Sequence, residues 1–290
     1  MNWAIVVAII SPLIYAASNI LDKYVLSHRV KSPLGYAGIA GIVNICIALF
    51  LILLLDWNIS HSVLIYPIIT GILAGACLYF YFYLLKHTDA SYIIGFIYLY
   101  PIIVALLSYL FLQEQLSFLS YAAIGIILLG IILLSIRAKQ NKVGILIIPL
   151  AVYILLLGGY EFFVKVTTNN LSFIQGLAID LLFCGITLVF GLLHPKVRYY
   201  FLKELKNFRW AIVGEGFTLL AAFSFFYATS KLPITIVATL GATQPLVVVL
   251  FERIAHARFG NITQDIRLVP KLGAIILIVV GVILLSILNS

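Results

Sequence analysis

Residues 83–104 read YLLKHTDASYIIGFIYLYPIIV, and residues 227–248 read YATSKLPITIVATLGATQPLVV. Aligned on Pro101 and Pro245, the two stretches match without a gap, and the tyrosines that open them fall opposite each other. Each stretch begins where one apolar segment ends and runs through most of the next. Self-similarity of this kind indicates a chain built from two copies of one unit.

The composition around these stretches is that of a membrane protein. Hydrophobic residues make up 64% of the 290 residues and charged residues 10%, against about 45–50% and about 25% in soluble domains. A spanning helix needs about 20 mostly apolar residues. The apolar runs predict spans at 3–24, 34–55, 63–85, 91–112, 118–136, 144–166, 172–193, 209–229, 234–254 and 269–288.

Two further pairs of segments extend the repeat. GIILLGIILLSI from Gly125 resembles GAIILIVVGVILLSI from Gly273, and Asn19-x-x-x-Lys23 resembles Glu161-x-x-x-Lys165. The alternative is chance similarity, since Leu, Ile and Gly are common in all membrane helices. The aligned prolines favour the repeat. We therefore expect an all-α integral membrane protein of ten transmembrane helices.

The ten helices are expected to form two five-helix repeats, residues 1–139 and 140–290. Because five is odd, the second repeat enters the membrane in the opposite sense. Inverted repeats of this kind occur in many secondary transporters, with the substrate site near mid-membrane between the halves.

The basic residues are distributed very unevenly between the two sides of the expected membrane. The side facing the termini holds only Lys165 and Lys231. The loops after the odd-numbered spans hold Lys23, Arg29, Lys31, Lys86, Arg137, Lys139, Lys142, Lys196, Arg198, Lys203, Lys206, Arg209, Arg253, Arg258, Arg267 and Lys271. The positive-inside rule places these loops in the cytoplasm and both termini outside. The longest hydrophilic loop, 194–209, predicts a short interfacial helix.

Ionisable residues inside the expected spans are candidate functional residues, because a charge in the membrane is costly and usually faces a cavity or a partner. Glu161 and Lys165 are four residues apart, so they share a helix face and can pair. Asp180 is expected at the depth of Glu161, and Glu215 near the opposite surface. The structural alternatives are a neutral pair that orients helices and side chains that reach the interface. Asn19 is the repeat counterpart of Glu161 and a further candidate.

Aromatic residues gather at 79–83 and at the matching place in the second half. Interface belts explain many tyrosines in membrane proteins. The candidates for lining a central cavity and stacking on an organic solute are Tyr79, Tyr83, Tyr98 and Tyr227.

Pro101 and Pro245 each remove a backbone hydrogen bond inside an expected span. Their matched positions predict a pair of hinges for alternating access, with static kinks as the alternative. Gln244 can hydrogen-bond the carbonyls that the proline releases, or a ligand.

The whole pattern resembles a known family, the EamA branch of the drug/metabolite transporter (DMT) superfamily. The residues that carry the resemblance are Ala90-Ser91, Pro101, Leu112-Gln113-Glu114-Gln115-Leu116 and the glycines Gly125 and Gly130. The resemblance implies a secondary transporter of an amino acid or a related amphipathic solute, with export commoner than uptake.

The sequence departs from the family at two points. Ala257-Arg258-Phe259 stands where an acidic residue closes the ninth span, and Glu252 lies half a span earlier. Many relatives also have both termini inside, opposite to the orientation that the loop charges predict.

The function expected is secondary active transport of a small organic metabolite across the cell membrane, with a proton as the coupling ion or with substrate exchange. The alternatives are a lipid-carrier flippase or another lipid-handling membrane protein, since basic loops suit anionic head groups, and a scaffold without transport. The sequence has no Walker A loop, HExxH or CxxC motif, so we expect no enzyme, catalytic residue, metal site or cofactor. The partners expected are the substrate and the bilayer, in a monomer or homodimer, and no nucleic acid.

Overall fold

The computed structural model describes residues 3–57, 59–87, 97, 99–135, 143–244, 246–248, 250–251 and 272–288. Within these residues the protein is helical and contains no strand. The main helices are α1 (Trp3–His28), α2 (Pro33–Leu54), α3 (Ile65–His87), α5 (Tyr100–Leu107), α6 (Phe118–Ser135), α7 (Val143–Asn170), α8 (Phe173–Phe190), α9 (Pro195–Glu204), α10 (Phe208–Lys231), α11 (Ile234–Gly241) and α13 (Leu272–Leu288). The short helices are η1 (His61–Val63), η2 (Ser108–Leu112, a π-helix), η3 (Gly191–Leu193) and η4 (Leu205–Asn207).

Six helical stretches of the described chain are long and apolar enough to cross a membrane. They contain α1, α2, α3, α7, α8 and α10, and each coincides with an expected span. Three shorter apolar helical stretches, at Tyr100–Leu112, Phe118–Leu133 and Gly273–Leu288, lie where further spans are expected, and so do the described residues of Ile234–Val248. The coarse prediction of an all-helical membrane protein is confirmed.

Several helices begin with the chemistry that favours a helix start. Ser32 caps α2 by accepting a hydrogen bond from the Gly35 amide, and Pro33 occupies the first turn. Ser172 caps α8 through the Gln175 amide. Such caps satisfy backbone donors that have no partner inside the helix, which matters most where water is scarce.

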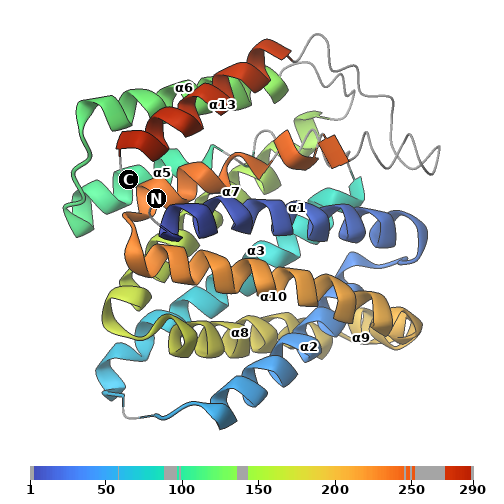
Figure 1. Ribbon diagram of the computed structural model, residues 1–290. Helices are drawn as coiled ribbons and strands as arrows, with labels where there is room; N and C mark the ends of the chain where they lie inside the picture. Colours follow the sequence, from blue (N-terminus) through green and yellow to red (C-terminus); the bar gives the residue numbers. More distant parts are fainter. Residues whose placement is uncertain are drawn as a thin grey trace.

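The helices pack in a crossed arrangement that joins the first half of the chain to the second. In Figure 1, α1 runs beside α10 and α6 runs beside α13, and these pairs are among the most extensive contacts. The α2–α8, α3–α7 and α3–α8 pairs are the other large ones. The ends of α1 and α13 that carry the chain termini lie at the same end of the bundle.

Glycines let two of these pairs approach closely. A Cβ on Gly130 of α6 would lie 2.9 Å from the Ala274 oxygen, and a Cβ on Gly281 of α13 would lie 3.1 Å from the Ala123 oxygen. The α2–α8 pair meets in the same way, because a Cβ on Gly185 would lie 2.6 Å from the Gly41 oxygen. A larger residue at any of these places would push the helices apart.

The two short helices α5 and α11 meet each other beside α7 and α1. Pro101 lies in the first turn of α5, where the absence of an amide hydrogen costs no helical bond. A hydrogen bond of 3.0 Å from the Tyr100 hydroxyl to the Ala238 carbonyl joins α5 to α11. α11 ends at Gly241, before Gln244, so the described backbone does not continue as one regular helix toward Pro245, which lies outside the described residues.

The helix expected in the long hydrophilic loop is present as α9, so the predicted secondary structure of this loop is confirmed. The α9 helix packs on α2. Its last residue, Glu204, is buried and accepts a hydrogen bond of 2.7 Å from the Lys31 amide. The helix is therefore held to the bundle by a specific carboxylate contact as well as by packing.

Candidate functional site

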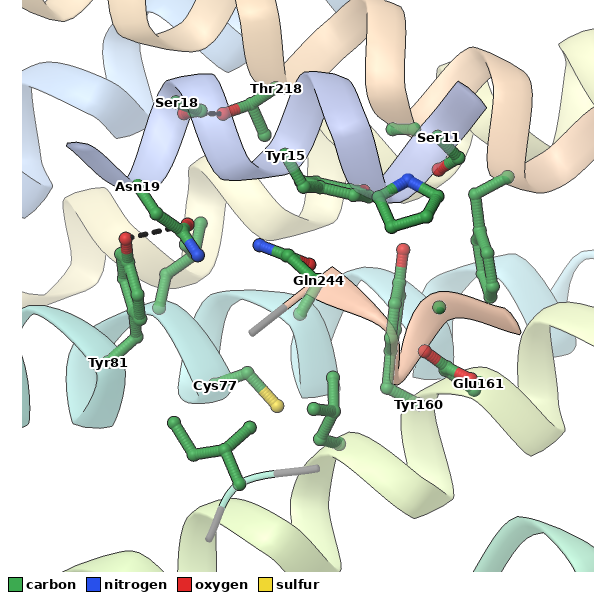
Figure 2. A pocket seen from close by; sticks show the side chains of 18 of the residues that line it. Ser11, Tyr15, Ser18, Asn19, Cys77, Tyr81, Tyr160, Glu161, Thr218 and Gln244 are labelled. Carbon is green, nitrogen blue, oxygen red and sulfur yellow. Dashed lines mark hydrogen bonds between the residues drawn. The ribbon is translucent and has the colours of Figure 1, made fainter. Parts of the chain in front are cut away.

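A cavity of about 180 Å³ lies among the helices of both halves. Its walls come from α1, α2, α3, α5, α7, α8, α10 and α11. The volume is far above the roughly 10–15 Å³ that one water needs. Figure 2 shows Asn19 and Tyr81 at one end, Glu161 and Tyr160 at the other, and Gln244 between them. The cavity is therefore large enough for a small solute and is bounded by polar groups along its length.

Glu161 of α7 and Asp180 of α8 line this cavity as carboxyl groups with incomplete hydrogen bonding. Their side chains are only 7% and 3% exposed. The Glu161 Oε2 and Asp180 Oδ1 atoms have no hydrogen-bond partner among the described residues. The neighbouring hydroxyls of Tyr100 and Thr70 lie within reach of Glu161 and Asp180 respectively. A buried charge without a partner is costly, so each carboxyl needs a proton or a cationic ligand to complete its site.

A second pair of carboxyl groups lies where α1 faces α10. Asp22 lines the cavity, and Glu215 is buried within electrostatic reach of it. The Tyr81 hydroxyl lies 3.4 Å from Asp22 Oδ2, and the Asn44 side chain is the hydrogen-bonding neighbour of Glu215. Glu215 Oε2 has no partner in the described chain. Glu215 itself is not a lining residue, but it lies within electrostatic reach of Asp22 and Tyr15, which are.

Lys165 does not bind the carboxyl four residues before it. Its Nζ donates to the Thr229 carbonyl at 2.9 Å and to the Leu232 carbonyl at 2.8 Å, at the end of α10. The carboxylate that acts electrostatically on Lys165 is Glu114. The expected pairing of Glu161 with Lys165 is thus absent from the described contacts, because the long lysine side chain reaches the end of the neighbouring helix.

Three of the predicted tyrosines, Tyr79, Tyr83 and Tyr227, are described by the structure and are not lining residues of the cavity. The Tyr79 hydroxyl binds the end of α8, where it accepts a hydrogen bond of 3.1 Å from the Gly191 amide. Tyr83 is 37% exposed and packs on His87. Tyr227 makes an edge contact with Phe173. Their use as substrate contacts would require a different arrangement of the helices.

The other predicted residues divide between the cavity and the undescribed part of the chain. Asn19 lines the cavity and accepts a hydrogen bond of 2.8 Å from the Tyr81 hydroxyl. Gln244 is buried and also lines it. Tyr98 lies outside the described residues, as Pro245 does.

Several residues of the cavity wall were not predicted from the sequence. Asp22 was not predicted because Lys23 follows it directly and suggested a helix end, whereas α1 continues to His28. Tyr81 was not predicted because five consecutive aromatic residues point to all sides of a helix, and periodicity does not specify which one faces inward. The remaining missed residues with polar side chains are Ser11, Tyr15, Ser18, Asn44, Tyr100, Tyr153, Tyr160 and Thr218.

Comparison with known proteins agrees with this architecture. Residues 2–136 match the EamA-like transporter family, so the family resemblance expected from the sequence is confirmed over the first half of the chain. A solved structure described as "Crystal structure of protein" has a TM-score of 0.69 and 16% sequence identity, covering 100% of this chain and 98% of that one. That likeness shows a shared fold. The comparison with curated proteins found no match. The family match and the apolar helices together indicate a membrane transporter of small solutes.

Proposed function

From the premise that residues 2–136 belong to the EamA-like transporter family, we propose that the chain is a secondary transporter of a small organic metabolite. Amino acids and related amphipathic solutes are the first class to test, and export is the expected direction. The observation that carries the proposal is the cavity, which is lined from both halves and holds carboxyl groups that lack partners. A static scaffold has no need of such groups in its interior.

Alternating access requires two halves that can exchange roles, and we propose residues 1–139 and 140–290 as inverted five-helix repeats. The reciprocal contacts of Gly130 and Gly281 support this division, because each glycine faces the helix that carries the other. The large α1–α10 and α3–α7 contacts support it as well. When the two halves are aligned on Pro101 and Pro245, α1 corresponds to α7 and α10 corresponds to α3, so each helix pair is the counterpart of the other.

We place the coupling step at Glu161, with Asp180 as a second carboxyl group of the same cavity wall. A proton or a positively charged substrate group must accompany a carboxylate that is buried without a partner. Glu215 lies within electrostatic reach of Tyr15, as Asp180 and Glu161 do. The arrangement therefore favours coupling through a shared set of carboxyl groups over coupling through the Lys165 ammonium.

The ends of α5 and α11 are the proposed moving parts. Both helices are short, and they contact each other and the cavity through Tyr100 and Gly241. Interrupted helices at the binding site are a recurring feature of transporters built from inverted repeats. Pro101 and Pro245 are the proposed hinge positions.

For localisation we propose the cell membrane, with the termini outside, as the loop charges predict. A tag at either terminus that is accessible only from the cytoplasm would overturn the orientation and leave the proposed repeat intact. The oligomeric state expected is a monomer or a homodimer.

The direct test is uptake into proteoliposomes that contain the purified protein. A panel of amino acids and amphipathic amines is screened with and without an imposed pH gradient, beside protein-free liposomes. We expect saturable uptake of at least one solute. Absence of uptake for the whole panel, together with movement of a labelled polyprenyl phosphate between leaflets, would replace this proposal by the flippase alternative.

A further inference from the structure

The charges around the cavity are all of one sign within the described part of the chain. Asp22, Glu161 and Asp180 line the cavity, and Glu215 lies behind it. Among the described lining residues there is no Lys, Arg or His. A cavity of this kind attracts a cation and repels an anion.

The nearby lysines do not supply the missing positive charge, because their ammonium groups bind backbone carbonyls. Lys23 donates to the Leu85 carbonyl at 2.9 Å, Lys86 to the Val30 carbonyl at 2.8 Å, and Lys165 to two carbonyls at the end of α10. None of the three is a lining residue. The carboxyl atoms that lack partners therefore point to a positive charge that arrives from outside the described protein.

Two of these carboxyl groups lie close enough to act on the same neighbours. Glu161 and Asp180 both lie within electrostatic reach of Tyr15 and of Cys77, which also line the cavity. Each is more than nine-tenths buried and has an oxygen without a partner. One ammonium group has three donors, so it can bind a carboxylate of this wall and neighbouring acceptors at the same time.

Aromatic rings form much of the remaining wall near Glu161. The Tyr160 and Phe225 rings stack with their centroids 6.4 Å apart, and both residues line the cavity. Tyr15, Tyr100 and Tyr153 add further rings. Rings hold the apolar part of a solute and attract a cation over their faces.

We infer that the substrate is an organic amine that carries a net positive charge and an apolar or aromatic body, and that it has no carboxylate of its own. This inference rests on the proposed function and narrows its solute class to amines, so amino acids are expected to be the poorer ligands. A zwitterionic amino acid would place its carboxylate among three carboxyl groups and no described cation, where only the neutral amides of Asn19, Asn44 and Gln244 and the hydroxyls can donate to it. An amine lacks that repulsive group.

Three probes that share one ring and differ only in their charged groups test this choice. They are phenethylamine, L-phenylalanine and 3-phenylpropionate, titrated calorimetrically at pH 7 into the purified full-length protein in detergent. We expect phenethylamine to bind roughly tenfold to a hundredfold more tightly than phenylalanine, the range for a hydrogen bond to a charged group, and phenylpropionate to show no binding. Equal binding of all three, tighter binding of phenylalanine, or no binding of phenethylamine would overturn the inference.

Two variants locate the binding group, and a third is the matched control. Glu161→Gln and Asp180→Asn each keep the shape of the side chain and remove its charge, so each should weaken phenethylamine binding by about tenfold or more. Asp56→Asn alters an exposed carboxylate outside the cavity wall and should leave the affinity unchanged. Loss of affinity in the control, or its retention in both cavity variants, would place the amine elsewhere and contradict the inference.

Binding and transport are read separately, so the two proposals can fail separately. Saturable phenethylamine binding without uptake into proteoliposomes would contradict the transporter and leave the amine site standing. Uptake of phenylalanine or phenylpropionate without phenethylamine binding would uphold the transporter and remove the amine site.

Discussion

The helices α1 and α7 are counterparts in the proposed repeat, and two pairs of matched positions on them make different contacts. Lys23 of α1 donates to the Leu85 carbonyl near the end of α3, and Lys165 of α7 donates to the Thr229 carbonyl near the end of α10. In the proline-anchored register Leu85 and Thr229 are counterparts. The same contact is therefore made twice, once in each half.

Four residues earlier on each helix the chemistry is not repeated. Asn19 of α1 is bonded to the Tyr81 hydroxyl at 2.8 Å. Its counterpart Glu161 is acidic, and the counterpart of Tyr81 is Phe225, which has no hydroxyl to donate. Glu161 thus keeps an oxygen without a partner. The lysine contact is made in both halves, whereas the contact four residues earlier is made in one, and we propose that Glu161 serves binding while Lys23 and Lys165 serve stability.

The contacts shared by both halves should be the most sensitive to substitution. Gly130→Leu would place a branched side chain against the backbone of α13, since even a Cβ would lie 2.9 Å from the Ala274 oxygen. We expect a loss of about 3 kcal/mol or more of stability, at the upper end of overpacking effects. Thermal unfolding in detergent and the yield of monodisperse protein measure it.

The matched control lies on the same helix. Gly125→Leu alters a glycine at which an added Cβ would meet no atom within 4 Å, so folded protein should be obtained at the normal yield. Gly281→Leu should be as damaging as Gly130→Leu. If Gly281→Leu alone left the stability unchanged, Gly130 and Gly281 would not contribute equally to the contact between α6 and α13.

Substitutions at Glu161 and at its counterpart Asn19 should change transport without lowering stability. Glu161→Gln should reduce the initial rate of substrate uptake by roughly tenfold to a hundredfold, the effect of losing an interaction with a charged group. Asn19→Ala removes a neutral hydrogen bond and should reduce the rate by a few-fold. Radiolabelled uptake into proteoliposomes measures both rates. Equal losses in the two variants would contradict the proposed functional difference between Glu161 and Asn19.

Much of the fold could be predicted from the sequence, because the information needed is local. Apolar runs of sufficient length predict spanning helices, and six of the expected spans coincide with long apolar helices. The hydrophilic loop correctly predicted α9. Its sequence carries both the proline that starts the helix and the polar residues that keep it outside the core.

The candidate site was predictable only in part, because it depends on how each helix is rotated about its axis. Asp180 was predicted from the cost of a charge in a membrane and Gln244 from its place before Pro245, and both line the cavity. In the aromatic run at 79–83, the inward residue is Tyr81, while Tyr79 binds the end of α8. Tertiary packing sets that rotation, and the local sequence does not specify it.

Substitution of Lys23 and of Lys165 should lower stability equally, and neither substitution should alter substrate recognition. Lys23→Met and Lys165→Met each remove a charged donor to helix-end carbonyls, so each should lower stability by about 1–3 kcal/mol. Substrate affinity, measured calorimetrically on the folded protein, should stay within about threefold of the original because neither ammonium lines the cavity. A large loss of affinity in Lys165→Met alone would restore the predicted functional pairing of Lys165 with Glu161.

The smallest effect is expected at the hinge prolines, and it separates motion from stability. Pro101 lies in the first turn of α5, where Pro101→Ala adds an amide hydrogen without removing any helical bond. We expect unchanged yield, a thermal midpoint close to the original, and turnover slowed by a few-fold, because the helix start becomes less constrained. Pro245→Ala should slow turnover to the same degree if the hinges act as a pair. Stopped-flow uptake under a fixed gradient measures the rate, and normal turnover in both variants would establish the prolines as static features of the two halves.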